Sequence, residues 1–230
     1  MQTFAIGDIH GCNRTFRALL KSLPLHPGDR LILLGDLIDR GPASKQVIDT
    51  VFSLRKAGHE VVCIRGNHEQ LLLETLHGSR DLETWLFNGG RQTLESFGVQ
   101  KPEDIPVKYL RFFQSMPFWF ETMGYLCVHG GLDFTCADPL NEPETLLWMR
   151  RWYDQIDYGW LGTRIVLHGH TPESLETIRA QYDCLAEQQY LNLDNGCVYA
   201  RLGRSGNALG RLLAFCVDTR MLHSQTCQNE

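Results

Sequence analysis

The sequence predicts an α/β (α+β) fold, with a central β-sandwich of two mixed sheets flanked by helices. Three observations lead to this prediction. In the first half, short runs rich in leucine, isoleucine and valine alternate with segments of helical period, which is typical of βαβ units. The second half contains mostly strand-like runs. Most runs close on a polar cluster, as expected where strands end at a ligand-binding edge of a sheet.

The first half is expected to hold three strands, each followed by a helix. The strands are TFAIGD, RLILLGD and EVVCIRG, and the helices span residues 13–23, 42–57 and 67–77. Residues 82–115 have a helical pattern with a break at KPEDIP. This pattern predicts a helical insert, about residues 80–116, over one edge of the sheet.

In the second half, the apolar runs predict further strands and one helix. The strands are FWFETM, YLCVHGG, RIVLHGH, SLETIRA, QYLNLDNG and RLLAFCVD, and the helix lies near residues 142–152. The polar segment after about residue 218 is expected to fray. Neither a repeat nor a linker is visible, so we expect a single domain over residues 1–230.

Composition excludes some classes of partner. The net charge of −5 disfavours binding to nucleic acid or to an anionic membrane through the overall field. The start, MQTFAIGDIHG, lacks the pattern of an export signal, and no run approaches the ~18 apolar residues of a membrane-spanning helix. We therefore expect a cytoplasmic protein without nucleic-acid or membrane partners. Its eight scattered cysteines form no C-x-x-C pair and are expected to be thiols.

Five short motifs follow the strand-like runs and carry most of the chemistry. As possible metal ligands they supply two Asp, three or four His and one Asn, a mixture that suits octahedral Mn²⁺, Fe or Zn²⁺ better than a closed structural zinc site. Each motif alone would be interpreted as a cap or a turn. Jointly they predict an open site with two metal ions about 3.5–4 Å apart, able to clamp a displacement at phosphorus. The motifs are DIHG (8–11), GDLIDRG (35–41), RGNHE (65–69), VHGG (128–131) and HGHT (168–171).

These motifs resemble the signature blocks of the phosphoprotein phosphatase family, in its bacterial and bacteriophage form, over residues 7–171. The resemblance implies the calcineurin-like metallophosphoesterase fold and a binuclear centre with two divalent ions. We expect Mn²⁺, although Fe or Zn²⁺ suits the same ligands. The resemblance also implies the metal ligands, with Asp36 as the bridge: Asp8, His10, Asp36, Asn67, His129 and His170.

The same resemblance assigns the catalytic residues. His68 is implied to be the general acid that protonates the leaving alkoxide, and Asp39 to orient it. Histidine is suited to this role because its pKa lies near the working pH. Arg40 and Arg65 flank the motifs and are expected to bind phosphoryl oxygens through their planar guanidinium groups and to assist catalysis. Arg150 resembles the third phosphate-binding arginine of the bacteriophage-type members.

Two residues beside the expected ligands receive supporting roles. His168 is expected to lie behind the ligands, because the family pattern places the ligand at His170. Glu69 is expected to brace its loop or to cap the following helix, where negative charge in the first turn is favourable. Residues 88–90, Asn-Gly-Gly, are interpreted as a turn or as part of the substrate mouth.

The resemblance implies hydrolysis of phosphoserine and phosphothreonine in proteins, with phosphotyrosine as a further option, by direct attack of a metal-bridging hydroxide. Phosphorylated proteins or peptides are then the partners. The alternative is a symmetrical dinucleoside tetraphosphate hydrolase. Members of that class typically lack the Asp-Arg pair and the Glu after the histidine, whereas this chain has Asp39, Arg40 and Glu69. A third hypothesis, an inactive metal-bound regulatory module, is disfavoured because every ligand and the acid are present.

Overall fold

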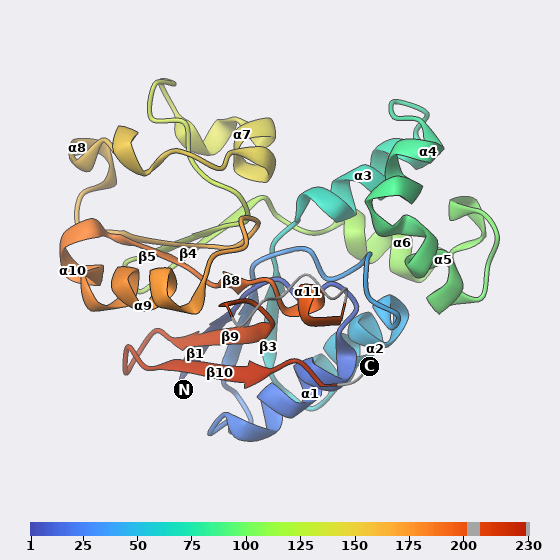
Figure 1. The fold of residues 1–230 in the computed structure, drawn as a ribbon, viewed down its shortest axis with the longest axis horizontal. Helices are drawn as coiled ribbons and strands as arrows, with labels where there is room; N and C mark the ends of the chain where they lie inside the picture. Colours follow the sequence, from blue (N-terminus) through green and yellow to red (C-terminus); the bar gives the residue numbers. More distant parts are fainter. Residues whose placement is uncertain (202–207, 229–230) are drawn as a thin grey trace.

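The computed structural model describes residues 1–201 and 208–228, and its two β-sheets pack between layers of helices (Figure 1). The first sheet has the order β10-β9-β1-β2-β3, with β8 paired to β9. β1, β2 and β3 run parallel, while β9 is antiparallel to β1, β8 and β10. Its strands are β1 (Thr3–Ile6), β2 (Arg30–Leu33), β3 (Glu60–Cys63), β8 (Asp194–Asn195), β9 (Arg211–Cys216) and β10 (Leu222–Thr226).

The second sheet has the order β4-β5-β6-β7, with β4 antiparallel and the others parallel. Both sheets are therefore mixed, and the predicted fold class is confirmed. The strands of this sheet are β4 (Trp119–Thr122), β5 (Tyr125–Val128), β6 (Ile165–His168) and β7 (Tyr190–Asn192).

Side-chain alternation along β1 explains how the sheets pack. Ala5 points into a core shared with the second sheet, where it meets Cys127 and Leu167. Phe4 and Ile6 point the other way, into a core covered by the helices of the first half. A strand buried on both faces is apolar at every position, which is why the runs in the sequence are continuous rather than alternating.

Helices surround the sandwich on its outer faces and edges (Figure 1). In the first half they are α1 (Asn13–Ser22), α2 (Ser44–Lys56), α3 (Asn67–Leu76), α4 (Leu82–Trp85), the π-helix η1 (Leu86–Gly90), α5 (Arg91–Phe97), the 3₁₀ helix η2 (Pro102–Asp104) and α6 (Val107–Gln114). In the second half they are η3 (Pro139–Asn141), α7 (Pro143–Trp148), η4 (Tyr153–Gln155), α8 (Tyr158–Leu161), α9 (Leu175–Asp183), α10 (Leu185–Gln188) and α11 (Cys197–Arg201). Among the described residues, none of these helices combines the length and the apolar character needed to cross a bilayer.

The structure corrects three details of the sequence analysis. SLETIRA forms helix α9 rather than a strand, because Ser174 caps the helix by accepting a hydrogen bond from the Thr177 N–H at 3.0 Å. The expected fraying after about residue 218 is wrong for residues 222–226, which pair with β9 as β10; residues 229–230 lie outside the described part. The helical insert is present, but it packs on α2 and α3 rather than over a sheet edge.

Candidate active site

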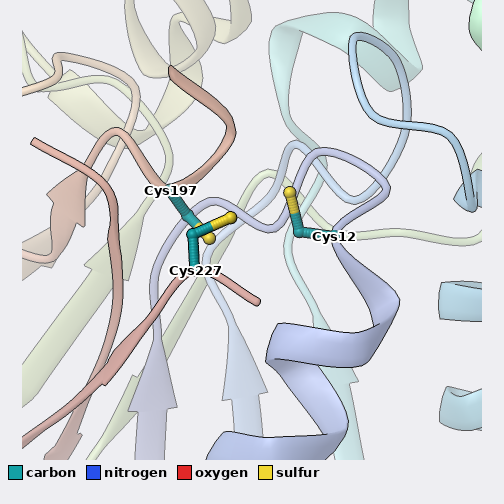
Figure 2. Close-up of side chains that lie close together, drawn as sticks. All are labelled: Cys12, Cys197 and Cys227. Carbon is teal, nitrogen blue, oxygen red and sulfur yellow. The ribbon is translucent and has the colours of Figure 1, made fainter. Parts of the chain in front are cut away.

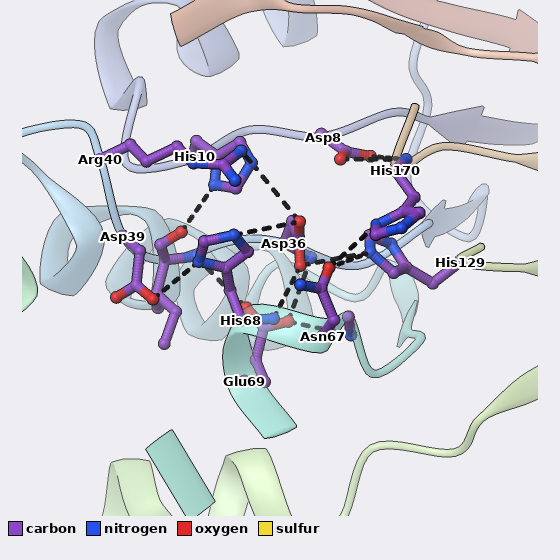
Figure 3. A network of polar contacts seen from close by, with 12 residues as sticks. Asp8, His10, Asp36, Asp39, Arg40, Asn67, His68, Glu69, His129 and His170 are labelled. Atoms are coloured by element: carbon purple, nitrogen blue, oxygen red, sulfur yellow. Dashed lines mark hydrogen bonds and ion pairs between the residues drawn. The ribbon is translucent and has the colours of Figure 1, made fainter. Parts of the chain in front are cut away.

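The polar ends of five strands meet at one edge of the sandwich (Figure 3). β1, β2 and β3 run parallel in one sheet, and β5 and β6 run parallel in the other, so their carboxyl ends gather on the same side. This convergence buries polar groups that lie far apart in the sequence. The structure brings together all six expected metal ligands, each at most 4% exposed: Asp8, His10, Asp36, Asn67, His129 and His170.

Asp36 lies at the centre of this cluster. Its Oδ2 is 3.4 Å from His10 Nε2, and its Oδ1 is 3.4 Å from His129 Nε2. The ligand-type atoms form two groups that share Asp36, one with His10 and His68 and the other with His129 and His170. A carboxylate that belongs to two groups occupies the position of a bridging ligand.

In three histidines of the cluster, one ring nitrogen is hydrogen-bonded to a backbone carbonyl. His10 Nδ1, His129 Nδ1 and His170 Nε2 lie 2.9, 2.8 and 3.2 Å from carbonyl oxygens. Because a carbonyl oxygen can only accept, these nitrogens donate, and the opposite nitrogens are turned into the cluster. His129 Nε2 and His170 Nδ1 both face Asn67 Oδ1, at 2.9 and 3.0 Å. This arrangement is typical of metal-ligating histidines held by outer hydrogen bonds.

The charges of the cluster perturb its pKa values in opposite directions. Burial alone would raise the pKa of Asp36, but the neighbouring histidines, His129 foremost, hold it well below its usual range. Burial opposes a charge on His129, yet the Asp36 carboxylate outweighs it and raises the pKa of His129 to about 9. Burial and the Asp194 charge raise the pKa of Asp8 well above its usual value. Carboxylate, imidazole and amide donors in an electronegative pocket fit divalent cations.

His68 is held differently from the other histidines. Its Nδ1 contacts a carboxylate, Asp39 Oδ2, at 2.8 Å, and its Nε2 lies 3.9 Å from Asp36 Oδ2. Asp39 is fully buried and also accepts hydrogen bonds from Trp85 Nε1 at 3.0 Å and Thr93 Oγ1 at 2.6 Å. The pair therefore presents His68 Nε2 to the cluster from a fixed direction, as a positioned acid requires.

Two of the three expected phosphate-binding arginines lie at the cluster. Arg40 Nη1 donates to His10 Nε2 at 2.6 Å, and its guanidinium also lies over the Tyr199 ring, 5.8 Å from the centroid. Arg150 Nη1 donates to the His170 carbonyl at 2.9 Å. Both guanidinium groups therefore contact residues that carry ligand nitrogens.

Arg65 is not brought into the cluster. Its Nη1 donates to Gln70 Oε1 at 3.1 Å and its Nη2 to the Gln114 carbonyl at 2.7 Å. The guanidinium also stacks over the Phe118 ring, 4.7 Å from the centroid. In this conformation Arg65 ties α3 to the chain around residues 114–118, and a catalytic role for it stays a prediction.

The two supporting residues take the places expected of them. Glu69 accepts hydrogen bonds from the backbone N–H groups of Gly66 and of residues 36–38, at 2.8–3.2 Å, and so braces the loop that carries the bridging carboxylate. His168 is buried outside both groups of ligand atoms, with its Nε2 2.9 Å from the Tyr153 hydroxyl.

The sequence analysis missed one acidic residue of the site. Asp194 is 3% exposed, and burial raises its pKa to about 6. Its Oδ1 accepts the Gly196 N–H at 2.7 Å, and its charge acts on Asp8. The signal was present, because LDNG closes a strand-like run in the same way as the other motifs.

The backbone of the site is strained. Five non-glycine residues with left-handed φ angles of 46–69° belong to the motifs, and such conformations concentrate at functional sites. They are His10, Asp36, Asp39, Arg40 and His170.

A cleft of about 480 Å³ opens beside the cluster. Arg40 belongs both to its wall and to the site. The other walls include Asn88 of the Asn-Gly-Gly segment, Arg91, Tyr199 and Phe87, whose side chain is 93% exposed. The lining of the cleft thus combines aromatic rings with cationic groups.

Comparison with known proteins identifies the family and several relatives. The family described as calcineurin-like phosphoesterase matches residues 1–199. A symmetrical bis(5'-nucleosyl)-tetraphosphatase of Pseudomonas putida is 33% identical over 133 residues, which cover 57% of this chain and 43% of the relative. The chain thus spans less than half the length of that relative. An asymmetrical bis(5'-nucleosyl)-tetraphosphatase of a Geobacillus species is 28% identical and is matched over 87% of its length and 86% of this chain.

Solved structures show the same fold. A chain described as a candidate diadenosine tetraphosphatase has a TM-score of 0.68 at 21% identity, covering 100% of this chain and 95% of its own. A protein serine/threonine phosphatase from Saccharomyces cerevisiae has a TM-score of 0.65 at 15% identity, covering 100% of this chain and 81% of its own. At these identities the likeness concerns the fold alone.

Proposed function

This chain belongs to the calcineurin-like phosphoesterase family, and we propose that it is a two-metal hydrolase whose first candidate substrates are dinucleoside polyphosphates. The main support for a two-metal hydrolase is the position of Asp36, which bridges two groups of histidine nitrogens. Two divalent ions, once bound, would supply Lewis acidity and lower the pKa of a water nucleophile. The residues to hold them are Asp8, His10, Asp36, Asn67, His129 and His170; Mn²⁺ is the first ion to test, ahead of Fe and Zn²⁺.

The names of the curated relatives support the nucleotide class and reverse the order of the two substrates given by the motifs. The cleft beside Arg40 supports it independently. Tyr199 and Phe87 offer rings on which a base can stack, while Arg40 and Arg91 can pair with phosphates next to the cluster. A dinucleoside polyphosphate carries both features, an aromatic base and a run of phosphates.

Phosphorylated proteins are the second candidate, and one observation favours them. The alkoxide that leaves phosphoserine needs a proton, whereas a leaving phosphate, with a pKa of about 6, departs without one. His68 held by Asp39 at 2.8 Å is the arrangement such a proton transfer needs. In this reaction Arg40 and Arg150 would orient the phosphoryl group and His68 would protonate the serine oxygen.

A direct rate comparison decides between the substrate classes. Diadenosine tetraphosphate, a phosphoserine peptide, a phosphotyrosine peptide and an aryl phosphate should be hydrolysed side by side with added Mn²⁺. We expect the highest kcat/KM on the dinucleotide. Faster cleavage of the phosphoserine peptide would transfer the protein to the second class, and failure on all four substrates would contradict the hydrolase itself.

Tyr199→Ala provides a sharper test of the cleft. It should raise KM for the dinucleotide much more than KM for the aryl phosphate, because base stacking contributes about 1–3 kcal/mol to binding, or roughly 5- to 150-fold. Tyr158→Ala, at a tyrosine 49% exposed and outside the cleft, is the matched control. Equal effects of the two substitutions would exclude the cleft as the nucleoside site.

A further inference from the structure

Three cysteine side chains meet outside the proposed metal ligands. Cys12 and Cys197 are buried, at 0% and 2% exposure, and Cys227 is half-buried. Their Sγ atoms all lie within 4.8 Å of one another. Figure 2 shows that they approach from three separate segments: the turn before α1, the start of α11 and the chain after β10. Three segments that are far apart in the sequence thus place their thiols close together.

Hydrogen bonds donated by backbone N–H groups fix two of these segments. The Cys12 N–H donates to the Ile9 carbonyl at 3.0 Å. After Cys227, the N–H of Gln228 donates to Thr15 Oγ1 on α1 at 2.9 Å. The sulfur atoms therefore converge because of the fold itself, as the ligands of a preformed site do.

The chemistry of the donor set indicates a soft cation. Within the described residues, the group consists of sulfur donors alone, whereas the cluster around Asp36 offers nitrogen and oxygen. Thiolate ligands select Cu⁺ and Zn²⁺, while carboxylate and imidazole suit harder ions. Three sulfurs bound to one ion at about 2.3 Å lie roughly 3.8–4.0 Å apart. The three Sγ atoms, all within 4.8 Å of one another, are therefore close to the spacing that one shared ion requires.

We propose that Cys12, Cys197 and Cys227 form a binding site for one thiophilic cation, Cu⁺ or Zn²⁺, separate from the two ions of the hydrolytic centre. Each thiol that coordinates releases one proton to solvent, and no change of oxidation state is involved. Because Cys12 follows His10 by two residues, the ion would link the first ligand segment to the last described strand. It would thereby tie the turn that follows β1 to the segment that follows β10, the edge strand of the first sheet.

A disulfide is the competing use of these residues. It would join two sulfurs and leave the third without a role, so it does not explain why three converge.

Metal titration of the whole chain tests the site without any measurement of hydrolysis. The Cu⁺ arm is anaerobic competition with a chromophoric Cu⁺ chelator. The second arm uses Cd²⁺ as a probe for Zn²⁺, because cadmium–thiolate bonds give an ultraviolet charge-transfer band that nitrogen and oxygen ligands do not give. We expect one equivalent of thiolate-bound ion, and displacement of Cd²⁺ by Zn²⁺ or by Cu⁺ identifies the preferred metal.

Two substitutions and a control make the result specific. Cys227→Ser and Cys197→Ser should each weaken binding by more than about 100-fold, since even the loss of an outer contact to a metal ligand costs about 10- to 100-fold. Cys136→Ser, at a half-buried thiol outside the group, should bind as the parent does. Three outcomes would each overturn the proposal: the parent gives neither the charge-transfer band nor Cu⁺ binding, all variants bind with equal affinity, or protein purified under reducing conditions contains a disulfide between these cysteines.

Discussion

Glu69→Gln tests the brace beneath the bridging carboxylate. The two carboxylate oxygens of Glu69 accept four backbone N–H groups: Oε2 from Asp36 and Gly66 at 3.0 and 2.9 Å, and Oε1 from Leu37 and Ile38 at 2.8 and 3.2 Å. A glutamine has a single oxygen and an NH₂ group in place of the other. Two buried donors would therefore face another donor and lose their acceptor.

The expected loss of stability follows from these four bonds. Each buried donor left without an acceptor costs about 1–3 kcal/mol, so two cost about 2–6 kcal/mol. The neutral amide recovers part of this, because burial and the Asp36 charge raise the pKa of Glu69 to about 7 and make the ionised carboxylate costly. A net loss of about 2–4 kcal/mol lowers the melting temperature of a chain of this length by roughly 5–15 °C.

Calorimetry on Mn²⁺-loaded protein provides the assay. Asp36 has a left-handed φ of 50°, so release of its loop should also weaken Mn²⁺ binding. Glu95→Gln, on the exposed face of α5, is the matched control and should melt with the parent. If Glu69→Gln also melted with the parent and bound Mn²⁺ equally well, the brace would have no energetic role.

Four further predictions address the acid, the metal site, the metal-free fold and the backbone of the site. His68→Asn should lower turnover of a phosphoserine peptide by about 10²- to 10⁴-fold with both metals retained, and should affect an aryl phosphate far less; equal losses would contradict the acid role. Because His129 has a pKa of about 9 and must lose its proton to bind a metal, Mn²⁺ affinity should rise with pH and level off above about 9; calorimetric titration in two buffers measures the released proton. In the metal-free chain the stability from this raised pKa is complete below ~6.5 and lost as pH rises through about 9. Gly169→Ala would place a Cβ against Asp8 Oδ1 and should lower the Mn²⁺ content of the purified protein, which elemental analysis detects.

The convergence of the site could be predicted because it depends on topology. Asp36, His129 and His170 each follow a strand that has a parallel neighbour, and parallel strands end on the same side of a sheet. The direction in which a long side chain points cannot be predicted from strand topology in this way. Arg65 also follows a strand, but its guanidinium is directed by Gln114 and Phe118, which the packing of the helical insert places beside it.

Short elements were predicted less well, for a related reason. SLETIRA contains too few residues to distinguish alternation from helical period, and the hydroxyl of Ser174 decided the outcome by capping α9. The tail became a strand through tertiary pairing: His223 lies opposite Ala214, and Thr226 opposite Arg211. A polar edge strand carries little hydrophobic pattern, so only the presence of β9 reveals it.

The buried acids of the site connect folding with metal binding. Asp8, Asp194 and Glu69 all have raised pKa values, chiefly through burial and also through the charge of a neighbouring carboxylate, Asp194 for Asp8 and Asp36 for the other two. Such groups cost stability when they are ionised together without cations. Divalent ions at Asp36 would remove this repulsion and allow Asp8 to ionise as a ligand. The same carboxylates that weaken the metal-free fold would therefore favour the binding of divalent cations, so metal binding and folding should stabilise each other.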